Sequence, residues 1–325
     1  MLALALTGQI AWAVENSWFN TFVIDTITPD PRPVAWMVAT SAVTATLTTL
    51  LMGTLSDLYE WQLYNAALVG MGWEGTCYLY NNPLETHGAI ERRDWYEVPC
   101  CPSNLSRTWA TLPEDVLDCD GNTVYVGQYI SSKHHVWMDG GEIVLEMASS
   151  LPWAGEVHIN IMTAPHRPVT LKLRLPSWNL AAKLRLNGEV LQAVDEALPE
   201  TVSPQKASWL GLNRVWEPGD HIQLDFELPV RILHADHRVR SVQGKVALAR
   251  GPLVYCLESC DNPEVDLFRA VLDPSSLQAE PSDLFGGIVI ITGRTTHGEK
   301  LTFIPYHLWG NRGRSEMRVF VDTVS

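Results

Sequence analysis

Basic side chains and cysteines are scarce in this chain of 325 residues, and its first 57 residues hold almost no charge. Lysine and arginine number 23 against 37 acidic residues, which gives a net charge of −14. A nucleic-acid binder needs a basic surface to meet phosphates, so we expect no nucleic-acid partner. Six cysteines are too few for a disulfide scaffold. Apolar residues at 46% and charged residues at 18% nevertheless predict a folded chain with a sizeable core.

The first 57 residues differ in composition from the rest. They hold one basic side chain, Arg32, and four acidic ones, and residues 34–56 carry no charge at all. A helix of that length would span about 34 Å, enough to cross a hydrocarbon core of about 30 Å. We therefore expect an N-terminal pair of apolar helices, joined by the proline-rich residues 28–33, and membrane contact through residues 1–56. Two buried helices of a soluble protein are the alternative.

The chain is β-patterned from about residue 118 to its end. Residues 169–175 alternate apolar and polar side chains, as a half-buried antiparallel strand does, and Asn187-Gly188 is a hairpin signal. Short strands separated by turns predict two antiparallel β-sandwiches. The expected strands are 124–130, 142–147, 156–161, 169–175, 183–186, 221–228, 245–249, 287–291, 300–304 and 317–321. Their cores should include Val124, Val126, Leu171, Leu173, Leu175, Leu224, Phe226, Val246 and Leu248. Two helices are expected upstream, at 59–71 and 103–112.

The adjacent cysteines Cys100 and Cys101 lie between Pro99 and Pro102. Neighbouring cysteines rarely pair with each other, and two thiols held this way cannot both enter one core pocket. They can both reach one metal ion, and zinc accepts thiolate sulfur at about 2.3 Å. A zinc-bound cysteine is deprotonated, and a thiolate is a strong nucleophile. Taken alone, the dipeptide also fits a pair of inert cysteines.

Other candidate ligands carry weaker signals. Cys77 follows Glu74 at a Glu-x-x-Cys spacing, and Glu97 precedes Cys100 by three residues as a loop carboxylate. Neighbouring residues on a strand face opposite ways, so His134 and His135 should not chelate one ion. The remaining candidates are expected to be structural or satisfied residues, scattered through the fold: Cys119, Cys256, Cys260, His158, His221 and His234.

An ordered set of short motifs runs through residues 58–325: Tyr64-Asn65-Ala66-Ala67-Leu68, Asn82-Pro83-Leu84-Glu85, Trp95 to Asn104, Leu175-Pro176-Ser177-Trp178, Leu186-Asn187-Gly188, Trp216 to Asp220, and Ala249 to Tyr255. By these motifs the segment resembles glycoside hydrolase family 127, whose founding activity is a β-L-arabinofuranosidase. Residues 1–57 resemble the first two helices of a major-facilitator-type sugar transporter, ending at Gly53-Thr54-Leu55-Ser56-Asp57.

The resemblance implies a mixed fold, in which remnant helices of an (α/α)6 barrel precede the two β-sandwiches. The implied parts are a helical hairpin (1–57), a barrel remnant (58–117), a β-sandwich (118–235) and a second sandwich region (236–325). It implies retaining hydrolysis of an arabinose-containing oligosaccharide or glycan, with Cys100 as the nucleophile and Cys100 and Cys101 as ligands of Zn²⁺.

Family members carry a Glu-x-Cys ligand pair and an acid/base glutamate upstream, and we find neither in residues 1–99. We therefore expect a truncated enzyme with weak zinc binding and little turnover. The alternatives are a non-catalytic β-sandwich module that binds carbohydrate or another chain, and a fusion of a transporter start with a hydrolase end. The transporter-like Asp57 would place the hydrolase-like part in the cytoplasm, tethered to the membrane through the N-terminal helices.

Overall fold

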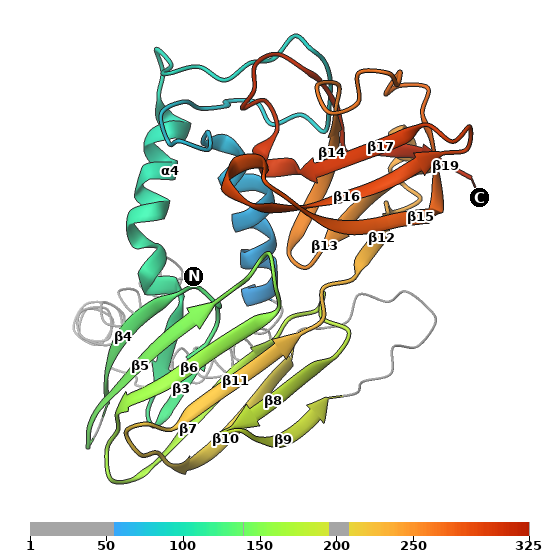
Figure 1. Ribbon diagram of the computed structural model, residues 1–325. Coiled ribbons are helices and arrows are strands. Elements are labelled where there is room, and N and C mark those ends of the chain that lie inside the picture. Colours follow the sequence, from blue (N-terminus) through green and yellow to red (C-terminus); the bar gives the residue numbers. More distant parts are fainter. Residues whose placement is uncertain (1–54, 139, 195–207, 325) are drawn as a thin grey trace, which may run out of the picture.

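The computed structural model describes residues 55–138, 140–194 and 208–324 (Figure 1). The expected N-terminal helical pair and its likeness to a transporter lie almost entirely outside these residues, and both stay predictions. Within the described ranges, no helix combines the length and the apolar character that crossing a membrane requires. The described chain is mostly β-structure with few helices.

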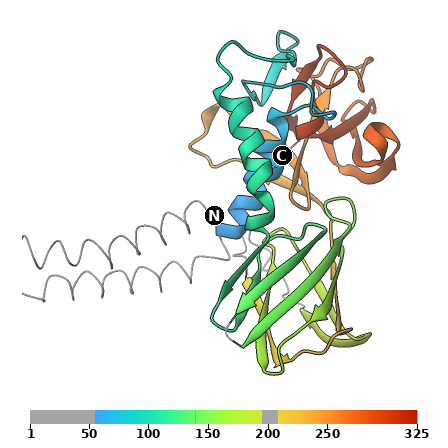
Figure 2. The ribbon, with the colours of Figure 1, turned by 90° about the vertical axis from the view of Figure 1, so that its left-hand side faces the viewer.

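Two helical segments run side by side between two β units (Figures 1 and 2). The first is α-helical over residues 55–62 and continues through the π turn η3 (Leu63–Ala67) and the 3-10 turn η4 (Leu68–Gly70). The second is α4 (Cys100–Thr111), followed by η5 (Leu112–Asp115). The expected helical start at residue 103 is wrong by one turn. Pro102 stands in the first turn, where its missing N–H breaks no helical hydrogen bond.

The sandwich unit consists of two facing sheets. One has the order β10-β7-β3-β2 and the other β4-β5-β6-β11-β8-β9. All neighbouring strands are antiparallel except β3 and β7, which run parallel. The strands are β2 (Leu117–Asp120), β3 (Thr123–Val126), β4 (Ser132–Met138), β5 (Gly141–Ser149), β6 (Glu156–Thr163), β7 (Pro168–Leu175), β8 (Ala182–Leu186), β9 (Glu189–Val194), β10 (Ser208–Val215) and β11 (His221–Phe226).

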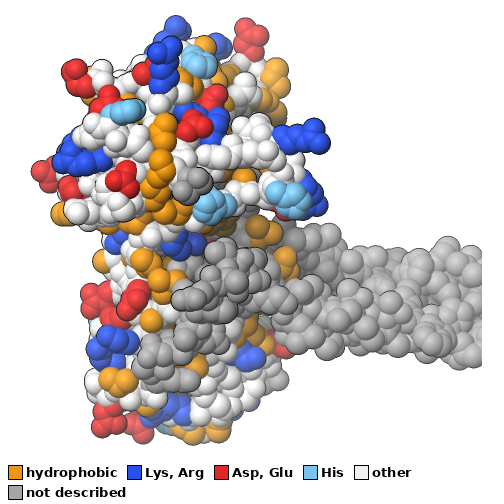
Figure 3. Space-filling view, turned by 90° about the vertical axis from the view of Figure 1, so that its right-hand side faces the viewer, with side chains coloured by type: hydrophobic (Ala, Val, Ile, Leu, Met, Phe, Trp, Pro, Cys, Tyr) orange, Lys and Arg blue, Asp and Glu red, His pale blue; other side chains and the backbone are white. Residues whose placement is uncertain are grey.

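The C-terminal unit is one nine-stranded sheet in the order β1-β18-β14-β17-β16-β15-β19-β13-β12. Since β13 pairs with both β14 and β19, the sheet closes on itself. It thereby encloses its core much as two facing sheets would, in place of the separate sheets of the expected second sandwich. Acidic and basic side chains are interspersed over its surface in Figure 3.

The elements of this unit are β1 (Glu85–His87), β12 (Val230–His234), η6 (Arg240–Val242), β13 (Lys245–Arg250), β14 (Leu253–Glu258), β15 (Val271–Ser282), η7 (Leu284–Gly286), β16 (Ile288–Thr295), β17 (Lys300–Pro305), η8 (Tyr306–Leu308), β18 (Glu316–Arg318) and β19 (Val321–Thr323).

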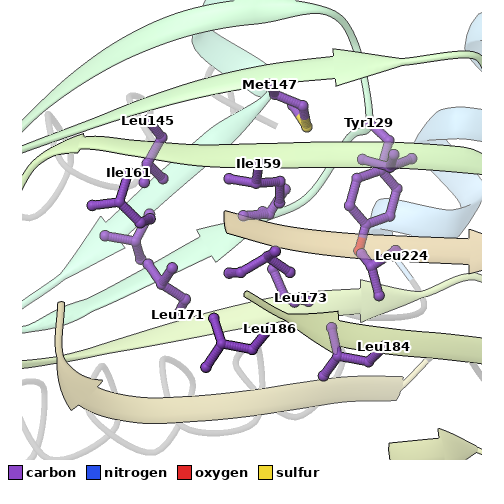
Figure 4. Packing of buried hydrophobic residues seen from close by; sticks show 14 of the residues in the cluster. Tyr129, Leu145, Met147, Ile159, Ile161, Leu171, Leu173, Leu184, Leu186 and Leu224 are labelled. Atoms are coloured by element: carbon purple, nitrogen blue, oxygen red, sulfur yellow. The ribbon is translucent and has the colours of Figure 1, made fainter. Parts of the chain in front are cut away.

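The expected core residues are confirmed. Eight of the nine are buried, and Leu175 is partly buried against the same cluster. In Figure 4, side chains from both sheets of the sandwich unit meet in one apolar layer, with Ile159 and Ile161 from β6 facing Leu171 and Leu173 from β7. Alternate burial along β11 follows from the period-2 pattern of its sequence. One expected strand, 124–130, is too long, because the chain turns at Gly127, whose N–H bonds to the Val116 carbonyl.

A buried ionic cluster joins the first helical segment to the sandwich unit. Arg174 on β7 is fully buried and bonds to Asp57 and, at 2.7 Å, to Glu60. The Trp178 indole N–H donates to Glu60 at 2.6 Å, and the Ser177 N–H donates to Asp57 at 3.0 Å. The expected domain boundary between residues 57 and 58 therefore falls inside a helix that is bonded to the sandwich.

The same helical segment is also bonded to the C-terminal unit. The side-chain amide of Asn65, in the π turn, donates to the Pro252 carbonyl at 2.7 Å, and its oxygen accepts from the Val254 N–H at 2.7 Å. A π turn widens the helix locally and is frequent at positions with a special role. Here it carries the residue that fastens the helix to β14.

Candidate active site

Cys100 and Cys101 open helix α4 and both are exposed free thiols. They were expected in the preceding loop, so this placement corrects the sequence analysis by one helical turn. Their sulfur atoms lie 3.9 Å apart, close enough for one ligand to touch both and too far for a disulfide. The structure thus brings the two predicted site residues together at the start of a helix.

The Tyr80 hydroxyl lies 2.8 Å from the Cys100 sulfur. Its ring packs on Tyr96 with centroids 5.1 Å apart, and its own N–H donates to the Tyr96 hydroxyl at 3.1 Å. Two bridges, Met71 to Tyr78 and Tyr78 to Arg93, hold this segment beside the loop that leads to Cys100. Sequence reasoning missed Tyr80, because a long-range contact across a loop leaves no periodic signal.

The surroundings of Cys100 favour its thiolate. The hydrogen bond from Tyr80, followed by the contact with the Cys101 thiol, lowers the pKa of Cys100 below its ordinary value. The same contacts raise the pKa of Tyr80, which therefore stays protonated and able to donate. The N-terminus of a helix adds a positive potential at this position. Cys100 is therefore equipped to act as a nucleophile.

A cavity of about 890 Å³ opens beside Tyr80, the hydrogen-bond partner of Cys100. Its wall combines aromatic rings with charged groups; Tyr80 lies in the wall, and neither cysteine does. Arg314, from the C-terminal unit, reaches the same cavity and holds Glu91 through two hydrogen bonds of 2.6 and 2.9 Å. The other polar and aromatic lining residues are Asn81, Arg93, Trp95, Tyr96 and Glu97. Such a mixture of flat apolar faces and hydrogen-bonding groups can hold a small polar ligand such as a sugar.

The two thiols fit one half of a zinc site. With zinc–sulfur bonds of about 2.3 Å and tetrahedral angles, two thiolates lie about 3.8 Å apart, and the observed separation is 3.9 Å. Structural and catalytic zinc sites use at least three protein ligands. Among the described residues, no third histidine, cysteine or carboxylate joins the pair. Glu97, Glu74 and Cys77 therefore do not complete the site, and no reaction step through zinc follows from these residues.

The described residues contain one group of three metal-ligating side chains, namely Glu258, Cys260 and Asp261. Arg312 already lies in this group, bonded to Glu258 at 2.7 Å and to Asp261 at 2.6 Å. The Gly310 N–H also donates to Glu258. A metal ion would have to displace the guanidinium, so an internal ion-pair network explains the cluster.

The chain matches three domain models of one enzyme family. Residues 51–114 match the catalytic domain of GH127 β-L-arabinofuranosidase, residues 123–228 match its middle domain, and residues 230–322 match the glycoside hydrolase family 127 C-terminal domain. The motifs quoted from the sequence lie within these segments, which confirms the expected family resemblance.

Proteins with this likeness include arabinofuranosidases. A non-reducing end β-L-arabinofuranosidase of Bifidobacterium longum subsp. longum is 29% identical over 312 residues, which are 82% of this chain and 45% of that protein. The crystal structure of a GH127 β-L-arabinofuranosidase from Geobacillus stearothermophilus superposes with a TM-score of 0.72 at 31% identity, covering 84% of this chain and 46% of the other. A second GH127 β-arabinofuranosidase structure gives a TM-score of 0.71 at 28% identity, with the same coverage. The chain thus spans about half the length of these relatives.

Proposed function

The chain carries the middle and C-terminal domains and a segment of the catalytic domain of glycoside hydrolase family 127. From this premise we propose that it acts as a β-L-arabinofuranosidase. Its homologues are non-reducing end β-L-arabinofuranosidases. The proposed substrate is an oligosaccharide or glycan that ends in β-L-arabinofuranose. The observation that carries the proposal is the exposed Cys100 thiol, bonded to Tyr80 at the edge of the 890 Å³ cavity.

In the proposed reaction, the Cys100 thiolate attacks the anomeric carbon. A carbon–sulfur bond forms while the glycosidic carbon–oxygen bond breaks, and the departing oxygen takes a proton from an acid. Water then attacks the same carbon and gives a proton to the conjugate base of that acid, while the carbon–sulfur bond breaks and the thiolate leaves, so two inversions retain the configuration. Tyr80 donates a hydrogen bond to the thiolate between turnovers, and the wall of the cavity orients the sugar. The acid is assigned to no residue of the described part.

We propose Zn²⁺ as the metal of this site, with Cys100 and Cys101 supplying two of its ligands. When bound, zinc would hold both thiols deprotonated. Two thiolates without further ligands lose most of the chelate affinity, so these residues alone should bind zinc weakly and turn over slowly.

The finer architecture is also a proposal. Residues 55–70 and α4 would be late helices of an (α/α)6 barrel, which is supported by their side-by-side packing (Figure 2). The transporter-like membrane contact of residues 1–56 and the cytoplasmic location belong to the same proposal. Carbonate extraction of membranes tests the contact, which fails if all of the protein is recovered in the soluble fraction.

A second candidate function is a non-catalytic carbohydrate-binding module. Trp137 on β4 favours it, because its side chain is 76% exposed on the outer face of the six-stranded sheet. Trp137→Ala should then weaken binding of an arabinan, whereas Cys100→Ser should leave it unchanged.

The nucleophile assignment can be tested with an arabinofuranose that carries a bromoacetyl group. Mapping the adduct by mass spectrometry should find it on Cys100. Cys260 is the matched control, because it is also exposed and lies in the C-terminal unit. Equal labelling of Cys100 and Cys260 would contradict the assignment.

A further inference from the structure

Two histidines of the sandwich unit, His158 on β6 and His221 on β11, form a pair that the sequence analysis treated as scattered. The strands are neighbours, with His221 opposite Asn160 and His158 opposite Gln223, so the two rings meet diagonally across the ladder. His158 Nδ1 lies 3.1 Å from His221 Nε2, and the ring centroids are 5.1 Å apart. The expectation that these residues stand alone is therefore wrong.

The other nitrogen of each ring has its own partner. His158 Nε2 lies 3.0 Å from a Glu156 carboxylate oxygen, which can only accept, so this nitrogen carries the proton. His221 Nδ1 lies 2.8 Å from the side-chain oxygen of Asn160, which likewise accepts. In the neutral rings, the nitrogens that face each other are then both lone-pair acceptors. Two acceptors at 3.1 Å repel unless a cation lies between or beside them.

We propose that His158 and His221 form a binding site for a divalent transition-metal ion of the kind that imidazole prefers, namely Zn²⁺, Ni²⁺ or Cu²⁺. At metal–nitrogen distances of about 2.0–2.1 Å, the observed 3.1 Å between the nitrogens corresponds to an angle of about 100° at the metal. That angle suits two neighbouring positions of a tetrahedral or tetragonal ion. Both side chains are partly exposed, so the rings can turn toward an ion and water can fill its remaining positions.

The partners of the pair have the role of orienting groups. Histidine ligands usually donate their second N–H to a carboxylate or carbonyl oxygen, which fixes the ring and its tautomer. Glu156 does this for His158, and Asn160 does it for His221. Oxygen-preferring ions such as Mg²⁺ and Ca²⁺ should not bind, because the facing ligands are nitrogens.

The site is separate from the cysteine pair, since it lies on the outer face of the sandwich unit. It bears on how zinc content is interpreted, because one zinc per chain would not by itself locate the ion at Cys100 and Cys101. Zinc measured in this protein should therefore be assigned to a site only by comparing variants of the cysteine pair with variants of the histidine pair.

The test uses the full chain with Cys100→Ser and Cys101→Ser, titrated with Cu²⁺ or Ni²⁺ by calorimetry. We expect one ion per chain, and His158→Ala or His221→Ala should weaken binding at least tenfold. Glu156→Gln, which removes an orienting partner, should weaken it less. His135→Ala is the matched control: His135 is an exposed histidine of the same sheet that bonds to Glu142 at 2.8 Å, and its loss should change nothing.

Electron paramagnetic resonance of the Cu²⁺ form should show two nitrogen ligands, one of which is lost in either alanine variant. His158→Gln or His221→Gln replaces the alanine variant if that variant does not fold. Unchanged affinity in the variants would overturn the proposal. A ¹⁵N spectrum that shows His221 Nε2–H donating to His158 Nδ1 in the presence of metal would overturn it as well.

Discussion

Arg174 offers the sharpest test of how the helical segment is held. Replacing it by methionine keeps most of the apolar stem and removes the guanidinium between Asp57 and Glu60. Glu60 is 3% exposed, so its carboxylate would be left buried with the Trp178 indole as its remaining described partner. Removing one partner of a buried ion pair costs about 3–5 kcal/mol. Arg174→Met should therefore lower the free energy of unfolding by about that amount.

Arg185→Met is the matched control for the destabilisation expected from Arg174→Met. Arg185 also bonds an aspartate, Asp225, within the sandwich unit, but both side chains of that pair are 31% exposed. A solvent-screened pair contributes about 0–1 kcal/mol, so this variant should stay close to the parent chain.

Urea denaturation followed by circular dichroism measures both variants. The triple variant Arg174→Met, Asp57→Asn, Glu60→Gln should recover part of the loss, since it buries no unpaired charge. Equal destabilisation by Arg174→Met and Arg185→Met would refute the reasoning that burial makes the first pair strong.

Three further predictions concern single residues. Burial lowers the pKa of His307 to about 4, so as the pH falls below about 6.5 the unfolded chain takes up a proton that the folded chain does not. The free energy of unfolding should therefore fall by about 3 kcal/mol as the pH is lowered from about 6.5 to about 4. His307→Phe should flatten this part of a plot of the urea midpoint against pH. Asn65→Ala removes two hydrogen bonds to the C-terminal unit and should cost about 1–3 kcal/mol, with the loss measured by thermal unfolding. Iodoacetamide should alkylate Cys100 with an apparent pKa below the ordinary value. It should alkylate Cys260 with a pKa above that value, because partial burial of the Cys260 thiol and the nearby Glu258 raise its pKa; the reverse order in peptide mass mapping would contradict this expectation.

The sandwich core was predictable because it rests on local pattern. Residues such as Leu171 and Leu173 alternate with polar neighbours on one strand, and this alternation alone puts them on the buried face. The ends of the strands were harder to predict than their cores. At Gly127, one backbone hydrogen bond ends a strand that the apolar composition would extend to residue 130.

The site was predictable only as far as its chemistry is local. Cys100 and Cys101 are adjacent in sequence, so their proximity needed no fold. Tyr80 lies twenty residues away and Arg314 more than two hundred, and only the folded chain brings them to one cavity. The partners of Asp57 and Asn65 were hidden for the same reason, since each contact joins segments that are far apart along the chain.

The most direct test of the central claim is turnover of an aryl β-L-arabinofuranoside by this chain, residues 51–325, joined to the upstream part of the Geobacillus relative's catalytic domain. We expect the joined protein to bind zinc and turn over the substrate, and we expect Cys100→Ser to abolish turnover while Cys260→Ser does not. Measuring zinc in a His158→Ala, His221→Ala background keeps the count specific to the cysteine pair. Undiminished turnover in the Cys100→Ser protein would contradict the claim that this thiol is the nucleophile.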